Sequence, residues 1–170
     1  MSYQPGMVGG MANWSAFAAA APALAEEVRA RFDAHTNKVL ATLRRDGWPR
    51  VSGIEATIDA GELWLAGIWG SVKFADLRRD PRMALHSGTE DPPEPPPAGK
   101  AFDAKVSGYA LEVTEPEVLA RFGGSDPEQK FHLFRVEVVD AAVVRLGDPP
   151  DHLVIESWRE GVGLKSTKRY

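Results

Sequence analysis

Ser71 and Lys73 are the residues whose types and spacing most directly suggest chemistry. They open residues 71–79, where inward-facing Phe74 and Leu77 predict a short helix. The first turn of a helix offers unpaired backbone amides and the positive end of the helix dipole, which suit an anion. A lysine in that turn opposes the dipole unless an anion is bound. The spacing alone leaves two interpretations open, an anion site or an N-capping serine followed by a solvated lysine.

Short strand-like runs separated by turns surround this helix and must position it. Before it, residues 39–43, 50–58 and 62–67 are joined by turns at Asp46-Gly47 and at residues 59–61, which predicts a meander of three antiparallel strands. After it, the same reasoning predicts strands over residues 83–85, 104–113, 131–146 and 152–158, with a short helix at residues 117–122 and a basic tail at the end.

Two further helices are expected before the strands. Ser15 is a candidate cap for residues 16–20, and Pro22 suits the first turn of a helix over residues 22–34. Apolar residues recur at four-residue spacing in the second helix, which predicts a stripe that covers the core. These residues are Leu24, Val28 and Phe32.

The predicted fold class is mainly β (α+β), because six or seven largely antiparallel strands with short flanking helices suit a small closed or partly closed barrel. At 170 residues the chain suits one domain, expected over residues 14–170 after a flexible N-terminal segment, residues 1–13. The proline-rich residues 92–97 are expected to form a surface loop that is dispensable for folding.

Composition excludes several classes of function. No apolar run approaches the ~20 residues that cross a bilayer, so we expect no membrane partner. A formal net charge of −4 gives no basic field for a phosphate backbone, so we expect no nucleic acid partner. The absence of cysteine favours a reducing compartment, and we expect a cytoplasmic protein. The four histidines lie far apart without metal-ligand spacing, so we expect no metal site.

The stretch from residue 39 to residue 87 reads VLATLRRDGWPRVSGIEATIDAGELWLAGIWGSVKFADLRRDPRMALHS. This order of strand, D-G turn, P-R-V-S strand, G-E-L-W-L strand, S-x-K helix start and D-P-R strand start resembles the pyridoxamine 5′-phosphate oxidase-like family of FMN-binding proteins. The W-R-x-G-x-G ending from Trp158 is similar to that of many actinobacterial members. The resemblance implies a six- to seven-stranded antiparallel split β-barrel. It also implies a homodimeric flavoprotein oxidoreductase that holds FMN between subunits and transfers hydride or electrons to a small-molecule substrate.

The resemblance also implies which residues bind the cofactor. The phosphate would be held by Ser71, Lys73 and Arg50. The ring would lie along Ser52, Gly53 and Ile54, next to Gly67, Ile68 and Trp69. Trp158 would reach the neighbouring subunit's pocket, or pack in the interface or core. At Val72 the sequence departs from the oxidases, which carry a further arginine there, so vitamin B6 oxidation itself is not implied.

Two alternatives remain open from the sequence. One is a reductase of the same fold that uses the 8-hydroxy-5-deazaflavin coenzyme. The other is a non-enzymatic protein that binds flavin or haem on the same barrel. No residue can be assigned a catalytic role, since in a flavoprotein the cofactor carries the redox chemistry.

Overall fold

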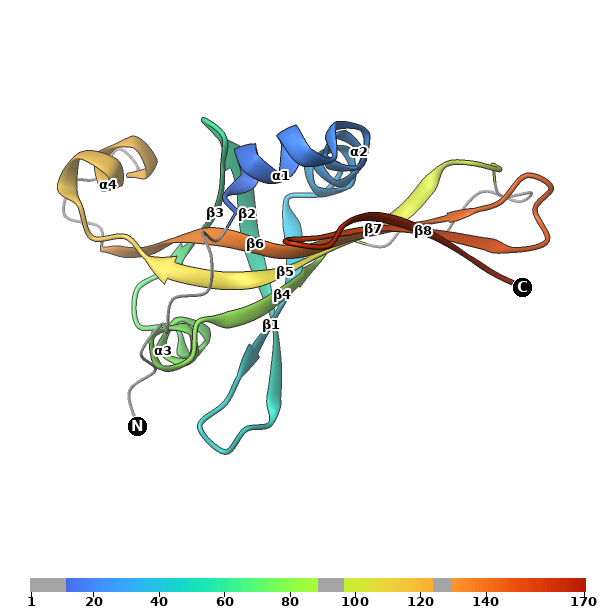
Figure 1. Cartoon of the computed structure of the whole chain (residues 1–170). Coiled ribbons are helices and arrows are strands. Elements are labelled where there is room, and N and C mark those ends of the chain that lie inside the picture. Colours follow the sequence, from blue (N-terminus) through green and yellow to red (C-terminus); the bar gives the residue numbers. More distant parts are fainter. Residues whose placement is uncertain (1–11, 89–96, 124–129) are drawn as a thin grey trace.

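The computed structural model describes residues 12–88, 97–123 and 130–170 of the chain, which fold around an antiparallel sheet (Figure 1). Its strands are β1 (Asn37–Leu43), β2 (Pro49–Asp59), β3 (Glu62–Ile68), β4 (Arg82–His86), β5 (Ala101–Glu112), β6 (Phe131–Leu146), β7 (Leu153–Arg159) and β8 (Gly163–Arg169). The helices are α1 (Trp14–Ala20), α2 (Pro22–Asp33), α3 (Val72–Arg79) and α4 (Pro116–Phe122). Residues 92–96 of the predicted proline-rich loop lie outside the described residues.

The sheet closes on itself through β6. Its strand order is β3-β2-β1-β4-β5-β6-β7-β8, and β3 also pairs with β6. The first part of β6 pairs with β3, from Leu63 opposite Val136 to Ile68 opposite Phe131. The last part, from Asp140 to Leu146, pairs instead with β7. One long strand therefore closes the barrel at one end and carries the β7–β8 hairpin, which extends away from the barrel, at the other (Figure 1).

The predicted meander and barrel are confirmed, with eight strands rather than six or seven. The additional strand is β8, which the sequence analysis treats as a basic tail. Its residues are mostly polar and exposed, so they show no alternation of apolar side chains. Gly161 and Gly163, with φ of 71° and 92°, form the turn that folds β8 back along β7.

The two N-terminal helices cover one opening of the barrel (Figure 1). The predicted stripe of Leu24, Val28 and Phe32 is buried, so its interpretation as a cover for the core is confirmed. The predicted cap of α1 was wrong. Asn13 accepts a hydrogen bond from the backbone N–H of Ala16, whereas the Ser15 hydroxyl donates to the carbonyl of Gly61. Asparagine and serine cap helices about equally well, so the sequence alone does not separate them.

Candidate cofactor site

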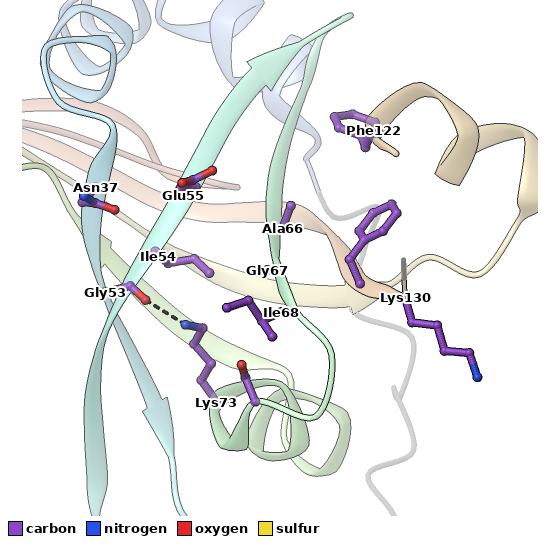
Figure 2. A pocket seen from close by; sticks show the side chains of 12 residues that line it. Asn37, Gly53, Ile54, Glu55, Ala66, Gly67, Ile68, Lys73, Phe122 and Lys130 are labelled. Atoms are coloured by element: carbon purple, nitrogen blue, oxygen red, sulfur yellow. Dashed lines mark hydrogen bonds between the residues drawn. The ribbon is translucent and has the colours of Figure 1, made fainter. Parts of the chain in front are cut away.

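A hollow of about 470 Å³ lies between β2, β3 and the start of α3 on one side and the end of α4 and the start of β6 on the other (Figure 2). Its lining combines apolar side chains, glycine backbone and a few charged groups. The lining residues are Asn37, Gly53, Ile54, Glu55, Ala66, Gly67, Ile68, Ser71, Lys73, Phe122, Lys130 and Phe131. The structure thus brings together Gly53, Ile54, Gly67, Ile68, Ser71 and Lys73 from the predicted cofactor residues.

Lys73 reaches across this hollow from α3 to β2. Its Nζ donates a hydrogen bond of 2.9 Å to the carbonyl of Gly53, which Figure 2 shows as a dashed line. No carboxylate within the described residues forms an ion pair with this ammonium group. An ammonium has three donors, so two remain for an anionic ligand. Lys73 therefore supplies an uncompensated positive charge at one end of the hollow.

Gly53 and Gly67 line the hollow for different physical reasons. A Cβ built on Gly53 would meet nothing within 4 Å, so a flat group can approach the backbone of β2 there. A Cβ on Gly67 would lie 2.9 Å from Cε2 of Phe74, which is fully buried. Gly67 is thus required by packing against α3, whereas Gly53 leaves open space.

Ser71 is the N-cap of α3, but its side chain makes no capping hydrogen bond. Its backbone N–H donates to the carbonyl of Ile68 at 3.3 Å. The hydroxyl, at the edge of the hollow, is therefore not committed to the helix. This arrangement fits an anion better than the alternative in which Ser71 serves only as a cap.

Arg50 lies on the other side of α3, next to a second hollow. Its Nε donates to the buried carboxylate of Asp76 at 2.6 Å, and Thr42 and Arg79 donate to the same carboxylate. Burial acts to raise the pKa of Asp76, but these hydrogen bonds outweigh it and lower the pKa below its usual range. The second hollow is lined by Arg44, Arg45, Asp46, Arg50, Val72, Ala75, Asp76 and Arg79. The phosphate residues predicted from the sequence are therefore split between two hollows that flank the start of α3.

Ser52, Trp69 and Trp158 do not line either hollow. Ser52 is half-buried on β2. Trp69 stacks on the imidazole of His132, with ring centroids 4.4 Å apart and planes 13° from parallel. Trp158 is buried in the core, and its ring lies 5.0 Å from that of Phe17. Of the interpretations considered for Trp158, packing in the core agrees with this position.

Sequence reasoning did not assign a site role to several residues of the first hollow, namely Asn37, Ala66, Phe122, Lys130 and Phe131. Phe122 and Phe131 come from α4 and β6, far from the S-x-K segment in sequence. Only the pairing of β3 with β6 brings them to the hollow, and no local pattern encodes that pairing. Glu55, noted from the sequence as a titratable group near the ring position, does line it.

No group of three or more potential metal ligands occurs in the part of the chain that the structure describes. The same residues include no helix with the length and apolar character needed to cross a membrane. The lining of the first hollow nevertheless fits an aromatic ring that carries an anionic chain. Open backbone at Gly53 and apolar side chains suit the ring, and Lys73 suits the anion.

Comparison with known proteins decides the family. The family model described as pyridoxamine 5′-phosphate oxidase matches residues 24–145, well over half of the chain. The chain belongs to the pyridoxamine 5′-phosphate oxidase family. The match covers every strand of the closed barrel and nearly all of β6, so the split barrel expected from the sequence is confirmed.

Solved structures agree on the fold of this family member. General Stress Protein 26 from Bacillus anthracis is 17% identical, covers 69% of this chain and 91% of its own, and superposes with a TM-score of 0.54. PhzG from Burkholderia lata, solved in complex with tetrahydrophenazine-1-carboxylic acid, is 14% identical, with 91% and 92% coverage and a TM-score of 0.57. At such low identity these structures show a shared fold alone. Among curated proteins, no sequence matches the chain.

Proposed function

We propose that this member of the pyridoxamine 5′-phosphate oxidase family is a flavoprotein oxidoreductase that binds FMN in the hollow between β2, β3 and α3. The observation that carries the proposal is the pairing of open backbone at Gly53 with the uncompensated ammonium of Lys73 at the edge of the same hollow. A flat ring needs the first feature and a phosphate needs the second. FMN, when bound, would supply hydride and electron transfer.

The chain's own residues would hold and orient this cofactor. Lys73 would offer its two free donors to the phosphate, with the uncommitted Ser71 hydroxyl beside it. The backbone of Gly53 and Gly67 and the side chains of Ile54 and Ile68 would line the ring. Arg50 would contribute only if the phosphate extends toward the second hollow, since its Nε is bound to Asp76. The ring contacts of Ser52, Trp69 and Trp158 remain predictions from the family resemblance.

The second hollow bears on the departure at Val72. Although Val72 carries no charge, Arg44, Arg45 and Arg79 line the same hollow. The cations there outnumber the two carboxylates, Asp46 and Asp76. Positive charge therefore remains next to residue 72, and it would accept phosphate from FMN or from the 8-hydroxy-5-deazaflavin coenzyme, the alternative that the sequence left open.

We also propose a homodimer. The outer face of β1 and β2 exposes apolar side chains, with Val39 at 42% and Val51 at 71% exposure. Next to it, β1, β4 and β5 form a largely apolar hollow of about 310 Å³ that includes Val39, Ala41 and Val106. A second copy of the chain would cover this face. Light scattering should then give a mass near twice the 18.5 kDa of the monomer, and a monomer at micromolar concentration would contradict the proposal.

Titration of the ligand-free protein with FMN, riboflavin and the 8-hydroxy-5-deazaflavin coenzyme tests the cofactor. We expect FMN to bind more tightly than riboflavin, because riboflavin lacks the phosphate. Tightest binding of the deazaflavin would select the alternative coenzyme, and no binding of any of the three would overturn the proposal. Turnover of reduced nicotinamide or reduced deazaflavin then separates an enzyme from a binding protein.

A further inference from the structure

His132 lies at the base of the loop that joins β3 to α3, and it contacts that loop in two ways. Its side chain is 2% exposed, and its Nε2 accepts a hydrogen bond of 3.1 Å from the backbone N–H of Gly70. Its ring also stacks under the indole of Trp69, which is 53% exposed. Residues 68 and 71, on either side of this contact, both line the proposed FMN hollow. His132 is therefore the buried anchor of the loop that forms one edge of the hollow.

The partner of the other ring nitrogen determines the tautomer. Nδ1 lies 3.0 Å from Oε1 of Glu112 on β5, and Arg78 on α3 donates to both oxygens of that carboxylate, at 2.7 and 2.6 Å. The hydrogen bonds from Arg78 lower the pKa of Glu112 below its usual range, so the group is a carboxylate and can only accept. Nδ1 must then carry the proton. Nε2 of the neutral ring is left as an acceptor, as the Gly70 N–H requires.

We propose that neutral His132 is a positioning residue for the cofactor site, and that its protonation detaches the Gly70 loop and weakens cofactor binding in acid. A second proton on the ring must go to Nε2, where it would point at the N–H of Gly70. Two donors cannot bond to each other, so the loop would lose this anchor. The part of the proposal that concerns binding rests on the proposed function, whereas the part that concerns Gly70 does not.

The charged surroundings of His132 come from three elements. Glu112 lies on β5, Arg78 lies on α3, and Lys130 precedes β6, with its Nζ 5.9 Å from the ring of Trp69. Arg78 also lies over Trp69, at 5.7 Å. The remaining contacts are the rings of Trp69, Phe74 and Phe134. Glu112 favours the second proton, while Arg78 and Lys130 oppose it, so no neighbour other than the Gly70 N–H reads out the state of Nε2.

The first test uses the ligand-free protein and nuclear magnetic resonance. As the pH falls from 8 to 5.5, the amide resonance of Gly70 should shift with the same midpoint as the ring resonances of His132. A Gly70 amide that stays fixed while His132 titrates would overturn the proposal, whether or not the protein binds FMN.

The second test measures the dissociation constant for FMN between pH 8 and pH 5.5 in a matched pair of variants. In His132→Gln the side-chain amide oxygen can reach the position of Nε2 and accept from Gly70 at every pH. In His132→Asn the shorter side chain can reach only the position of Nδ1 and loses the Gly70 bond. Circular dichroism and melting of both variants establish that they fold, and a variant that does not fold is replaced by Glu112→Gln, which removes the group that fixes the tautomer.

The wild-type dissociation constant should rise in acid by about three- to tenfold more than that of His132→Gln, which corresponds to one hydrogen bond of ordinary strength. His132→Asn should bind about three- to tenfold more weakly than the wild type at pH 8. Titration of the FMN phosphate itself cancels, because it is the same in every variant. Equal pH profiles for the wild type and His132→Gln would overturn the proposal even if FMN binds tightly. Absence of FMN binding to the wild type would instead count against the proposed function, and the Gly70 resonance would then decide the positioning role alone.

Discussion

The two sides of α3 use charged residues in opposite ways. On one side the carboxylate of Asp76 is buried and accepts from Arg50, Thr42 and Arg79. On the other side Lys73 reaches the edge of an open hollow, and its printed hydrogen bond is to a backbone carbonyl. The helix is the same, and so is the kind of residue. What differs is whether the opposite charge is supplied by the chain.

This difference separates a structural charge from one that is available to a ligand. Asp76 and its partners neutralise each other and join β1, β2 and α3, so their free energy is spent on folding. Lys73 lacks a carboxylate partner in the described structure, and an anion from solution would complete it. Substitutions on the two sides should therefore change different quantities, stability on one and cofactor affinity on the other.

The largest effect is expected for Asp76→Ala. The substitution leaves Arg50 and Arg79 without their carboxylate, and Thr42 without its acceptor. We expect the free energy of unfolding to fall by about 3 kcal/mol, the lower end for breaking a buried ion pair, since both arginine side chains are about a third exposed. Urea denaturation measures this. Asp46→Ala is the matched control, because the exposed pair of Asp46 with Arg44 should contribute less than ~0.5 kcal/mol. Equal losses in the two variants would remove the distinction between the sides.

Lys73→Ala should act on the other quantity. A hydrogen bond to a charged group contributes roughly 1.5–3 kcal/mol, so the dissociation constant for FMN should rise by about one to two orders of magnitude. Binding of riboflavin should change little, because it has no phosphate. The unfolding free energy should also change little, because only the half-exposed bond to Gly53 is lost. Equal losses of affinity for FMN and riboflavin would show that Lys73 does not hold the phosphate.

Only one side of this comparison could be predicted from the sequence. The S-x-K spacing placed Ser71 and Lys73 at a helix start, because a helix start has a local signature. The partnership of Asp76 with Arg50 and Thr42 has no such signature, since it joins three separate elements. For this reason the sequence assigned Arg50 to the phosphate, and the structure shows that its Nε is committed to Asp76.

The fold was predictable for the same kind of reason. Alternating apolar residues and turns at Asp46-Gly47 and around Gly61 are local, and they indicated the antiparallel meander. Closure of the barrel by β6 against β3 is not local, so the lining residues Phe122, Lys130 and Phe131 could not be foreseen. The polar β8 was missed because its residues lack an apolar face.

The two glycines that line the hollow give a smaller contrast. Gly67→Ala should lower the unfolding free energy by about 1–3 kcal/mol, because the new methyl group would overlap the buried ring of Phe74. Gly53→Ala should leave stability within about 0.5 kcal/mol or raise it slightly, because its Cβ meets open space. If the flavin ring lies over Gly53, that variant should bind FMN and riboflavin equally more weakly, unlike Lys73→Ala. Unchanged binding of both ligands would place the ring elsewhere.

The smallest effect concerns pH, because acid removes only the charge-dependent part of what Asp76→Ala removes outright. The pKa of Asp76 is lowered in the folded protein: burial raises it, but the hydrogen bonds from Arg50, Thr42 and Arg79 lower it further. A carboxyl group with a depressed folded pKa stabilises the protein above its unfolded pKa, about 3.9, and loses this contribution as the pH falls through the folded value. The difference in unfolding free energy between the wild type and Asp76→Asn should thus be constant above about pH 5 and narrow below pH 4. Lys73→Ala, which leaves the carboxylate intact, should follow the wild-type profile throughout. A difference between wild type and Asp76→Asn that stays constant down to pH 2 would mean that the charge of Asp76 contributes nothing beyond its shape, and the contrast between the two sides of α3 would then rest on Lys73 alone.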